Sequence, residues 1–239
     1  MPLPDVFAFC RSATQRQSHS LLMRRIVTAT HEPPLDSDVL EKPFSLVLLE
    51  DPCYLYQNSW ESTFYTTVPQ QYGMTFVSVA SEKSLSLSER VDSLKADVGQ
   101  IPDALLVARG PQSSWVAQLY LESLFLRGLV MVDPILFDKP TAVEQENLNT
   151  LAKGTDAAWG EFTMEAKKRP LKLEPNSVPM LVMSSHETKL EASREVAARH
   201  GDQSGPYGDI EMVEIDDSSS AENQLNVIKT IDDWVNTIY

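Results

Sequence analysis

The chain has 239 residues and a formal net charge of −14, with 34 acidic and 20 basic side chains. This length suits one α/β domain with a full core, and the even composition gives no sign of a second domain. The acidic balance argues against nucleic acid or an anionic membrane surface as the main partner. No run approaches the roughly 18 apolar residues of a membrane span, so we expect no membrane-spanning segment.

The first 31 residues differ in charge from the rest of the chain. They carry four arginines and one acidic residue, Asp5, which leaves a net charge of −17 for the remainder. The four arginines are Arg11, Arg16, Arg24 and Arg25. A basic, acid-poor start is typical of an organellar presequence. The alternation within Asp5–Cys10 and Ser20–Thr28 also fits an N-terminal β-hairpin, and both interpretations stay open.

Cysteine and histidine are sparse. Cys10 and Cys53 are too few for a disulfide framework or a cysteine-based zinc site. This usage favours an intracellular compartment, either the cytoplasm or an organelle such as the mitochondrion. His19, His31 and His200 show no carboxylate spacing typical of metal ligation, and we expect them at the surface. The sequence therefore predicts no metal site and no cofactor.

Apolar, β-branched runs alternate with helical patterns, which predicts a mostly parallel sheet with helices on both faces. We expect strands at residues 44–49, 74–80, 103–107, 129–132, 178–183 and 210–215. We expect helices at residues 60–72, 85–100, 115–127, 142–151, 189–200 and 223–239. Within residues 135–175, the large apolar side chains Trp159, Phe162 and Met164 should pack against the sheet and its helices. Residues 1–239 are predicted to form one α/β domain.

The central unit is a strand, a sharp turn at Arg109–Gln112, a buried helix over Trp115–Arg127 closed by Gly128, and a strand ending at Asp133. This unit resembles the core of the α/β-hydrolase superfamily, in which a strand presents the nucleophile on an elbow of the form G-x-S-x-G-G. The segments LVLLED, NSW, VAQLYLES and VPMLVM extend the resemblance over about residues 44–239. The resemblance implies an α/β-hydrolase fold in which residues 135–175 are a short lid.

The positions that carry catalysis in that superfamily hold other residues here. Aligned on the helix that follows, the elbow is Arg109–Ser114, and Pro111 stands at the nucleophile position. Thr188 matches the triad acid and Ser220 the triad histidine. Pro52, which has no N–H, matches the first donor of the oxyanion hole. Because a catalytic triad works only as a unit, the resemblance implies a member of the fold that lacks catalysis.

Two classes of function remain open. In the first, the chain is a scaffold or subunit bound to other proteins, or a sensor that binds a small molecule in the vestigial pocket. In the second, it is an esterase-like serine hydrolase with a relocated triad. That triad would use Ser113 or Ser114 as nucleophile, His186 as base, and Glu187 or Asp133 as acid. The other interpretation of the two serines is that they cap the central helix.

Overall fold

The computed structural model describes residues 27–35, 38–51, 59–82, 84–138, 157–175, 177–185, 187–201, 210–216 and 220–239. These residues form one seven-stranded sheet in the order β1-β3-β2-β4-β5-β6-β7. The strands are β1 (Val27–His31), β2 (Ser45–Glu50), β3 (Thr75–Val79), β4 (Ala104–Arg109), β5 (Gly128–Val132), β6 (Met180–Ser184) and β7 (Glu211–Glu214). β1 pairs with β3 antiparallel, and the other neighbours pair parallel. The predicted mostly parallel sheet is confirmed.

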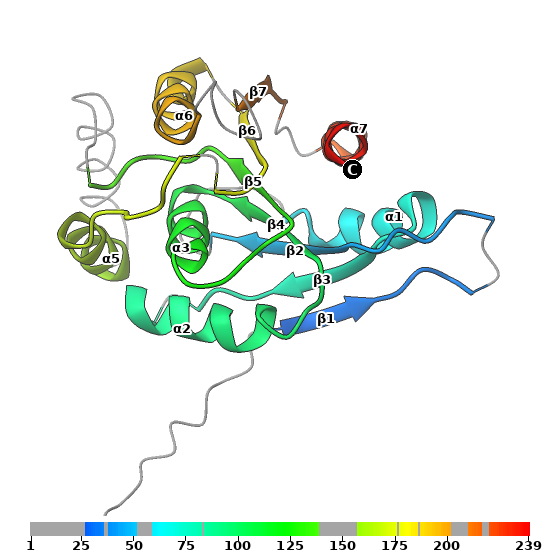
Figure 1. The fold of residues 1–239 in the computed structure, drawn as a ribbon, viewed down its shortest axis with the longest axis horizontal. Coiled ribbons are helices and arrows are strands. Elements are labelled where there is room, and N and C mark those ends of the chain that lie inside the picture. Colours follow the sequence, from blue (N-terminus) through cyan, green and yellow to red (C-terminus); the bar gives the residue numbers. More distant parts are fainter. Residues whose placement is uncertain are drawn as a thin grey trace, which may run out of the picture.

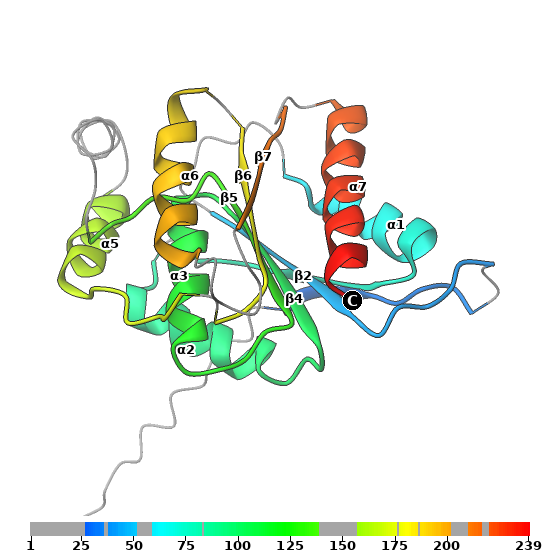
Figure 2. The same ribbon diagram turned by 45° about the horizontal axis from the view of Figure 1, so that its top comes forward.

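Helices cover both faces of the sheet (Figures 1 and 2). One face carries α2 (Leu87–Val98), α3 (Pro111–Leu121) and α6 (Glu187–His200), with α5 (Ala157–Lys168) next to α2, and the other carries α1 (Glu61–Tyr72) and α7 (Ala221–Ile238). Successive residues of a strand point to opposite faces. In β4, Leu106 therefore joins the core under α2 and α3, and Leu105 and Val107 join the core under α1 and α7.

The central helix α3 is buried over nearly its whole length. It begins at Pro111 and ends at Leu121, so the predicted helix from Trp115 to Arg127 is wrong at both ends. Proline is favoured at the first helical position, because its missing N–H has no partner to lose there. Gly128 opens β5 and does not close the helix. A Cβ at Gly128 would lie 2.9 Å from the Trp234 ring, so α7 packs directly against that strand.

The described residues of the predicted lid are 135–138 and 157–175, and they include the helix α5. Trp159 and Phe162 are buried in the same apolar cluster as Trp115 and Val116 of α3, as expected. Met164 is 57% exposed, so its predicted packing is wrong. It follows Phe162 by two residues, which on a helix turns it by about 200° away from the core. The predicted helix at residues 142–151 lies outside the described residues.

The N-terminal prediction is largely untested by the structure. Residues 27–31 form the edge strand β1, and the proposed strand Asp5–Cys10 lies outside the described residues. Cys10 and Cys53 lie outside them as well. None of the described helices combines the length and the hydropathy that crossing a bilayer requires.

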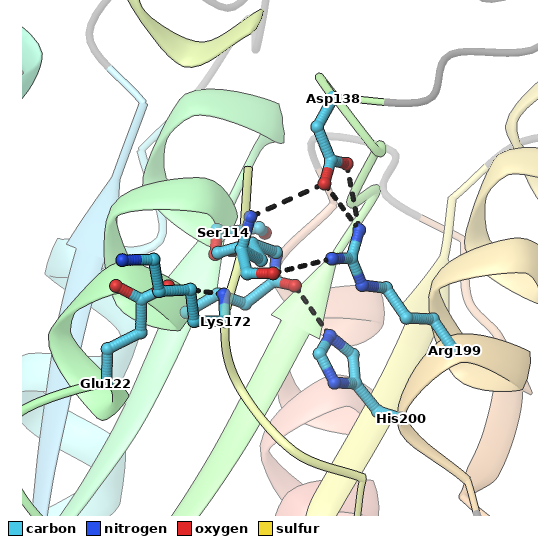
Figure 3. A network of polar contacts seen from close by, with 8 residues as sticks. Ser114, Glu122, Asp138, Lys172, Arg199 and His200 are labelled. Carbon is cyan, nitrogen blue, oxygen red and sulfur yellow. Dashed lines mark hydrogen bonds and ion pairs between the residues drawn. The ribbon is translucent and has the colours of Figure 1, made fainter. Parts of the chain in front are cut away.

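A polar network ties α3 to α6 (Figure 3). The Gln118 side-chain amide donates to the Ser114 carbonyl at 3.0 Å, and its oxygen lies 2.7 Å from the His200 Nε2. Because the amide oxygen of Gln118 can only accept a hydrogen bond, the neutral His200 ring must carry its proton on Nε2. Beside it, Arg199 Nη1 donates to both oxygens of Asp138 at 2.8 and 2.9 Å. His200 is 0% exposed, so its predicted surface position is wrong.

His200 should stay neutral in the folded protein down to about pH 4. Burial lowers its pKa from 6.5 to about 4, and the charge of Arg199 adds to the effect while Asp138 opposes it. In the unfolded chain the ring takes up a proton near its ordinary pKa of 6.5. Between this pH and about pH 4, the unfolded state therefore binds more protons than the folded state. The free energy of unfolding should therefore drop by up to about 3 kcal/mol between neutral and strongly acidic pH.

An NMR titration of the His200 ring protons measures this pKa directly. His200→Gln, which keeps a donor for Gln118, should lose less unfolding free energy than the wild type across the same pH range. A ring that titrates at its ordinary pKa would contradict the buried neutral state.

Candidate functional site

The order of the strands locates the candidate site. The chain passes from β2 to β3 on one side and then places β4 on the other side of β2. In open α/β sheets, ligands bind at such a reversal, just beyond the carboxyl ends of the strands. The residues that follow β2 and β4 are Asp51 and Gly110.

Gly110 makes the sharp turn between β4 and α3. Its φ is 101°, a region that residues with a side chain rarely adopt. The alignment placed Pro111 at the nucleophile position of this elbow, but Pro111 is the first residue of α3. A proline is held near a φ of about −65°, so it cannot make the left-handed turn. The glycine before the proline was a signal in the sequence that the turn lies one residue earlier.

Asp51 fills the space beside this turn. A Cβ atom added to Gly110 would lie 2.5 Å from the Asp51 Cβ and 3.2 Å from its Oδ2. The same Oδ2 accepts a hydrogen bond from the Gln112 backbone N–H at 2.9 Å. The Asp51 N–H in turn donates to the Arg109 carbonyl at 2.9 Å. Asp51 is only 5% exposed, so a buried carboxylate occupies the positive end of the α3 dipole.

A partly buried ion pair lies next to Asp51. Arg109, 2% exposed, donates from Nη1 to the Glu50 carboxylate at 2.7 Å, and its guanidinium lies 4.2 Å from the centre of the Trp60 ring. Glu50 also accepts the Trp60 backbone N–H at 3.0 Å and the Ser59 hydroxyl. The pair and the ring together hold the end of β2 against the start of α1.

The other flank of the α3 N-terminus is closed by α2 and α5. The Gln112 side-chain oxygen accepts from Arg90 Nη1 at 2.7 Å, and Arg90 Nε donates to the Leu85 carbonyl at 3.0 Å. The Arg90 guanidinium also lies 5.2 Å from the centre of the Phe162 ring on α5. A cavity that borders Arg90 has a volume of about 10 Å³. That is room for about one water molecule.

The two candidate nucleophilic serines lie inside the first turns of α3. The Ser114 hydroxyl donates to the Ala108 carbonyl at 3.2 Å. The Ser113 hydroxyl is buried and has no hydrogen-bond partner in the described part of the chain. Neither side chain caps the helix, because Asp51 accepts the Gln112 N–H, so the capping prediction is wrong. No described histidine bonds either hydroxyl.

Asp133, a candidate triad acid, already has partners for both oxygens. It follows β5 with a φ of 50° and is buried. One oxygen accepts the Ser185 N–H at 2.8 Å, and the other accepts the Ser185 hydroxyl at 2.6 Å and Lys189 Nζ at 2.8 Å. The sequence did not indicate Ser185 or Lys189, since nothing local links them to Asp133. Glu187, the other candidate acid, is the first residue of α6.

The remaining predicted positions are dispersed. The Ser220 hydroxyl accepts the Asn223 N–H at 3.2 Å, so the serine at the predicted histidine position caps α7. Thr188 lies in the first turn of α6. Pro52 and His186 lie outside the described residues. Within the ranges that the structure describes, no three His, Cys, Asp or Glu side chains are grouped as metal ligands would be.

Replacing Gly110 with alanine should cost about 3 kcal/mol of unfolding free energy, because the new Cβ meets Asp51 and the φ suits glycine. Gly160→Ala is the matched control, since a Cβ there meets no atom within 4 Å. Gly160 lies within α5, so the control should gain about 0.5–1 kcal/mol of helix stability. Urea denaturation of both variants measures the difference, and equal stabilities would contradict the close approach of Asp51.

No protein-family model and no curated protein matches the sequence. Solved structures do match the fold. Est1E from Butyrivibrio proteoclasticus has a TM-score of 0.59 at 11% identity, over 87% of this chain and 92% of that chain. Carboxyl esterase 2 from the mycorrhizal fungus Tuber melanosporum has a TM-score of 0.54 at 14% identity, over 96% and 92%. An alpha-beta serine hydrolase homologue from Coxiella burnetii has a TM-score of 0.52 at 12% identity, over 88% and 90%. The chain has the α/β-hydrolase fold.

Proposed function

We propose that this chain is a non-catalytic protein with the α/β-hydrolase fold, and that it serves as a scaffold or subunit in a larger protein assembly. The observation that supports this most strongly is the position of Asp51. Its carboxylate lies beside the elbow, where a nucleophilic side chain would project, and accepts the Gln112 N–H at the start of α3. A substrate oxyanion would meet a negative charge at this place, which opposes catalysis.

The turn at Gly110 supports the same proposal. If Gly110 takes the place of the nucleophile, the elbow has no side chain to attack a substrate. The next residue is Pro111, and in this fold the N–H of that residue is a donor of the oxyanion hole. Proline has no N–H, so this donor is missing too. Loss of a single oxyanion-hole donor costs about 10²–10³ in turnover.

The alternative is an esterase-like hydrolase with a relocated triad. The matched carboxyl esterase shares the fold at 14% identity, and the fold alone does not choose the chemistry. Ser113 and Ser114 are buried, and Asp133 is bonded to Ser185 and Lys189. These contacts weigh against the alternative, because a triad acid must hold its histidine.

A small-molecule sensor is the other non-catalytic role. The cavity beside Arg90, next to the elbow, has a volume of about 10 Å³. Pockets that bind drug-sized molecules are usually about 300–1,000 Å³. The cavity that the described residues form beside the elbow is far smaller than this, so we favour the scaffold over the sensor.

A fluorophosphonate probe tests for a reactive serine. We expect the full chain to stay unlabelled under conditions in which a known serine esterase is fully labelled. Gly110→Ser and Pro111→Ser should also leave p-nitrophenyl ester hydrolysis at the rate of the buffer, since neither variant removes the Asp51 carboxylate. Labelling of the wild type that disappears in Ser113→Ala or Ser114→Ala would establish the relocated triad.

Native size tests the scaffold role. We expect the endogenous protein to migrate, in size-exclusion chromatography of a native extract, at a mass well above the 26.7 kDa of the chain. Because elution depends on shape as well as mass, the recombinant chain alone is run on the same column as the reference. An endogenous protein that coelutes with this reference would contradict membership of an assembly.

A further inference from the structure

We propose that the outer edge of β7 binds an extended, basic segment of a partner protein, which adds to the sheet as a further strand. The β7 edge is defined here as residues 211–216 together with the groove between them and α7. This inference rests on the proposed role as a subunit, and it specifies the chemistry of one partner.

Among the described residues, no strand pairs with the outer side of β7. β7 ends the sheet and, among the described strands, pairs with β6 alone; Figure 2 shows it beyond β6 and beside α7. The Ile215 N–H donates to the Ser184 carbonyl at 2.9 Å. Backbone polar groups alternate in direction along a strand, so those of Met212 and Glu214 point outward. An extended peptide binds to a sheet edge through such N–H and C=O groups.

A groove beside the strand suits a long cationic side chain. It has a volume of about 210 Å³ and lies between the end of β7 and α7. The residues that line it include the apolar Ile215 and Val227 and the acidic Glu214 and Asp216, and the described lining residues include no lysine or arginine. Lysine and arginine place their alkyl stems on apolar surface and keep the charged head at its rim. The groove therefore matches the side chain of a basic partner residue.

The negative charges of the β7 edge favour a basic partner strand over a second copy of this chain. Glu211 and Glu214 are both exposed and lie at the two ends of β7. A second copy of the chain that paired along this edge would bring two negatively charged strands side by side, which is destabilising. Charged residues protect edges from self-association in this way, yet they attract a strand of opposite charge. The other edge strand, β1, has the sequence VTATH and no carboxylate, so a basic strand should choose β7.

Fluorescence anisotropy with a labelled, capped peptide of alternating arginine and valine, about six residues long, tests the proposal on the full chain. We expect saturable binding that weakens with added salt, and no binding of the same peptide with glutamate in place of arginine. Glu214→Lys should weaken binding about tenfold, since it replaces an attraction by a repulsion. Glu161→Lys, the same charge change at an exposed position on α5, is the matched control and should leave binding unchanged.

Two further measurements separate strand addition from a general attraction of charges. N-methylation of the peptide backbone should abolish binding, because it removes the N–H groups that pair with the edge. Met212→Pro should do the same from the protein side, since its outward N–H is not used to pair with β6, and proline is tolerated at such edge positions. Circular dichroism checks that this variant is folded, and the N-methylated peptide gives the same information without changing the protein.

Several outcomes would overturn the proposal. These are no binding of the arginine peptide, equal binding of the N-methylated peptide, and equal effects of Glu214→Lys and Glu161→Lys. A dimer of the chain that Met212→Pro dissolves would assign the edge to a second copy instead. The peptide assay does not measure catalysis, so an absence of peptide binding would not contradict the proposed lack of activity. Labelling of a serine by the fluorophosphonate probe would, in turn, not contradict a positive peptide result.

Discussion

The hydrogen bond between the Asp51 carboxylate and the Gln112 N–H is the contact on which the carboxyl edge of the sheet depends. It joins the end of β2 to the start of α3 at the point where the strand order reverses. The carboxylate needs the helix N-terminus as its partner, because a buried charge without one is costly. Gly110 must lack a side chain to let Asp51 approach. The turn, the acid and the helix start therefore constrain one another.

Several charged side chains around this contact are bonded within the chain. Arg109 pairs with Glu50, Arg90 with Gln112, and Lys189 with Asp133. An enzyme of this fold directs comparable groups at its substrate and keeps space for it. Here the same region is a packed junction of β2, β4, α1, α2 and α3. Such a junction stabilises the architecture.

The outer surface contrasts with this closed interior. Its charge is strongly negative once the basic first 31 residues are set apart. At β7, that charge coincides with outward backbone groups and with a groove. Charge decides which partner is attracted, and the backbone decides which conformation that partner takes. In the proposed role, a chain with the α/β-hydrolase fold contributes a sheet edge to an assembly.

The sequence by itself predicted the strands β2 to β7 and most of the helices, because their periodicity depends on neighbours in the chain, but it misplaced both ends of α3 and did not predict α5. The residue types also show, without a structure, that Gly110 can make the elbow turn and that Pro111 cannot. Only the tertiary structure decided that Asp51 reaches Gln112, that Lys189 reaches Asp133, and that His200 is buried. Asp51 and Gln112 are 61 residues apart, and their contact exists only because β2 and β4 lie side by side in the sheet. The environment of a side chain depends on such distant neighbours, which no local pattern contains.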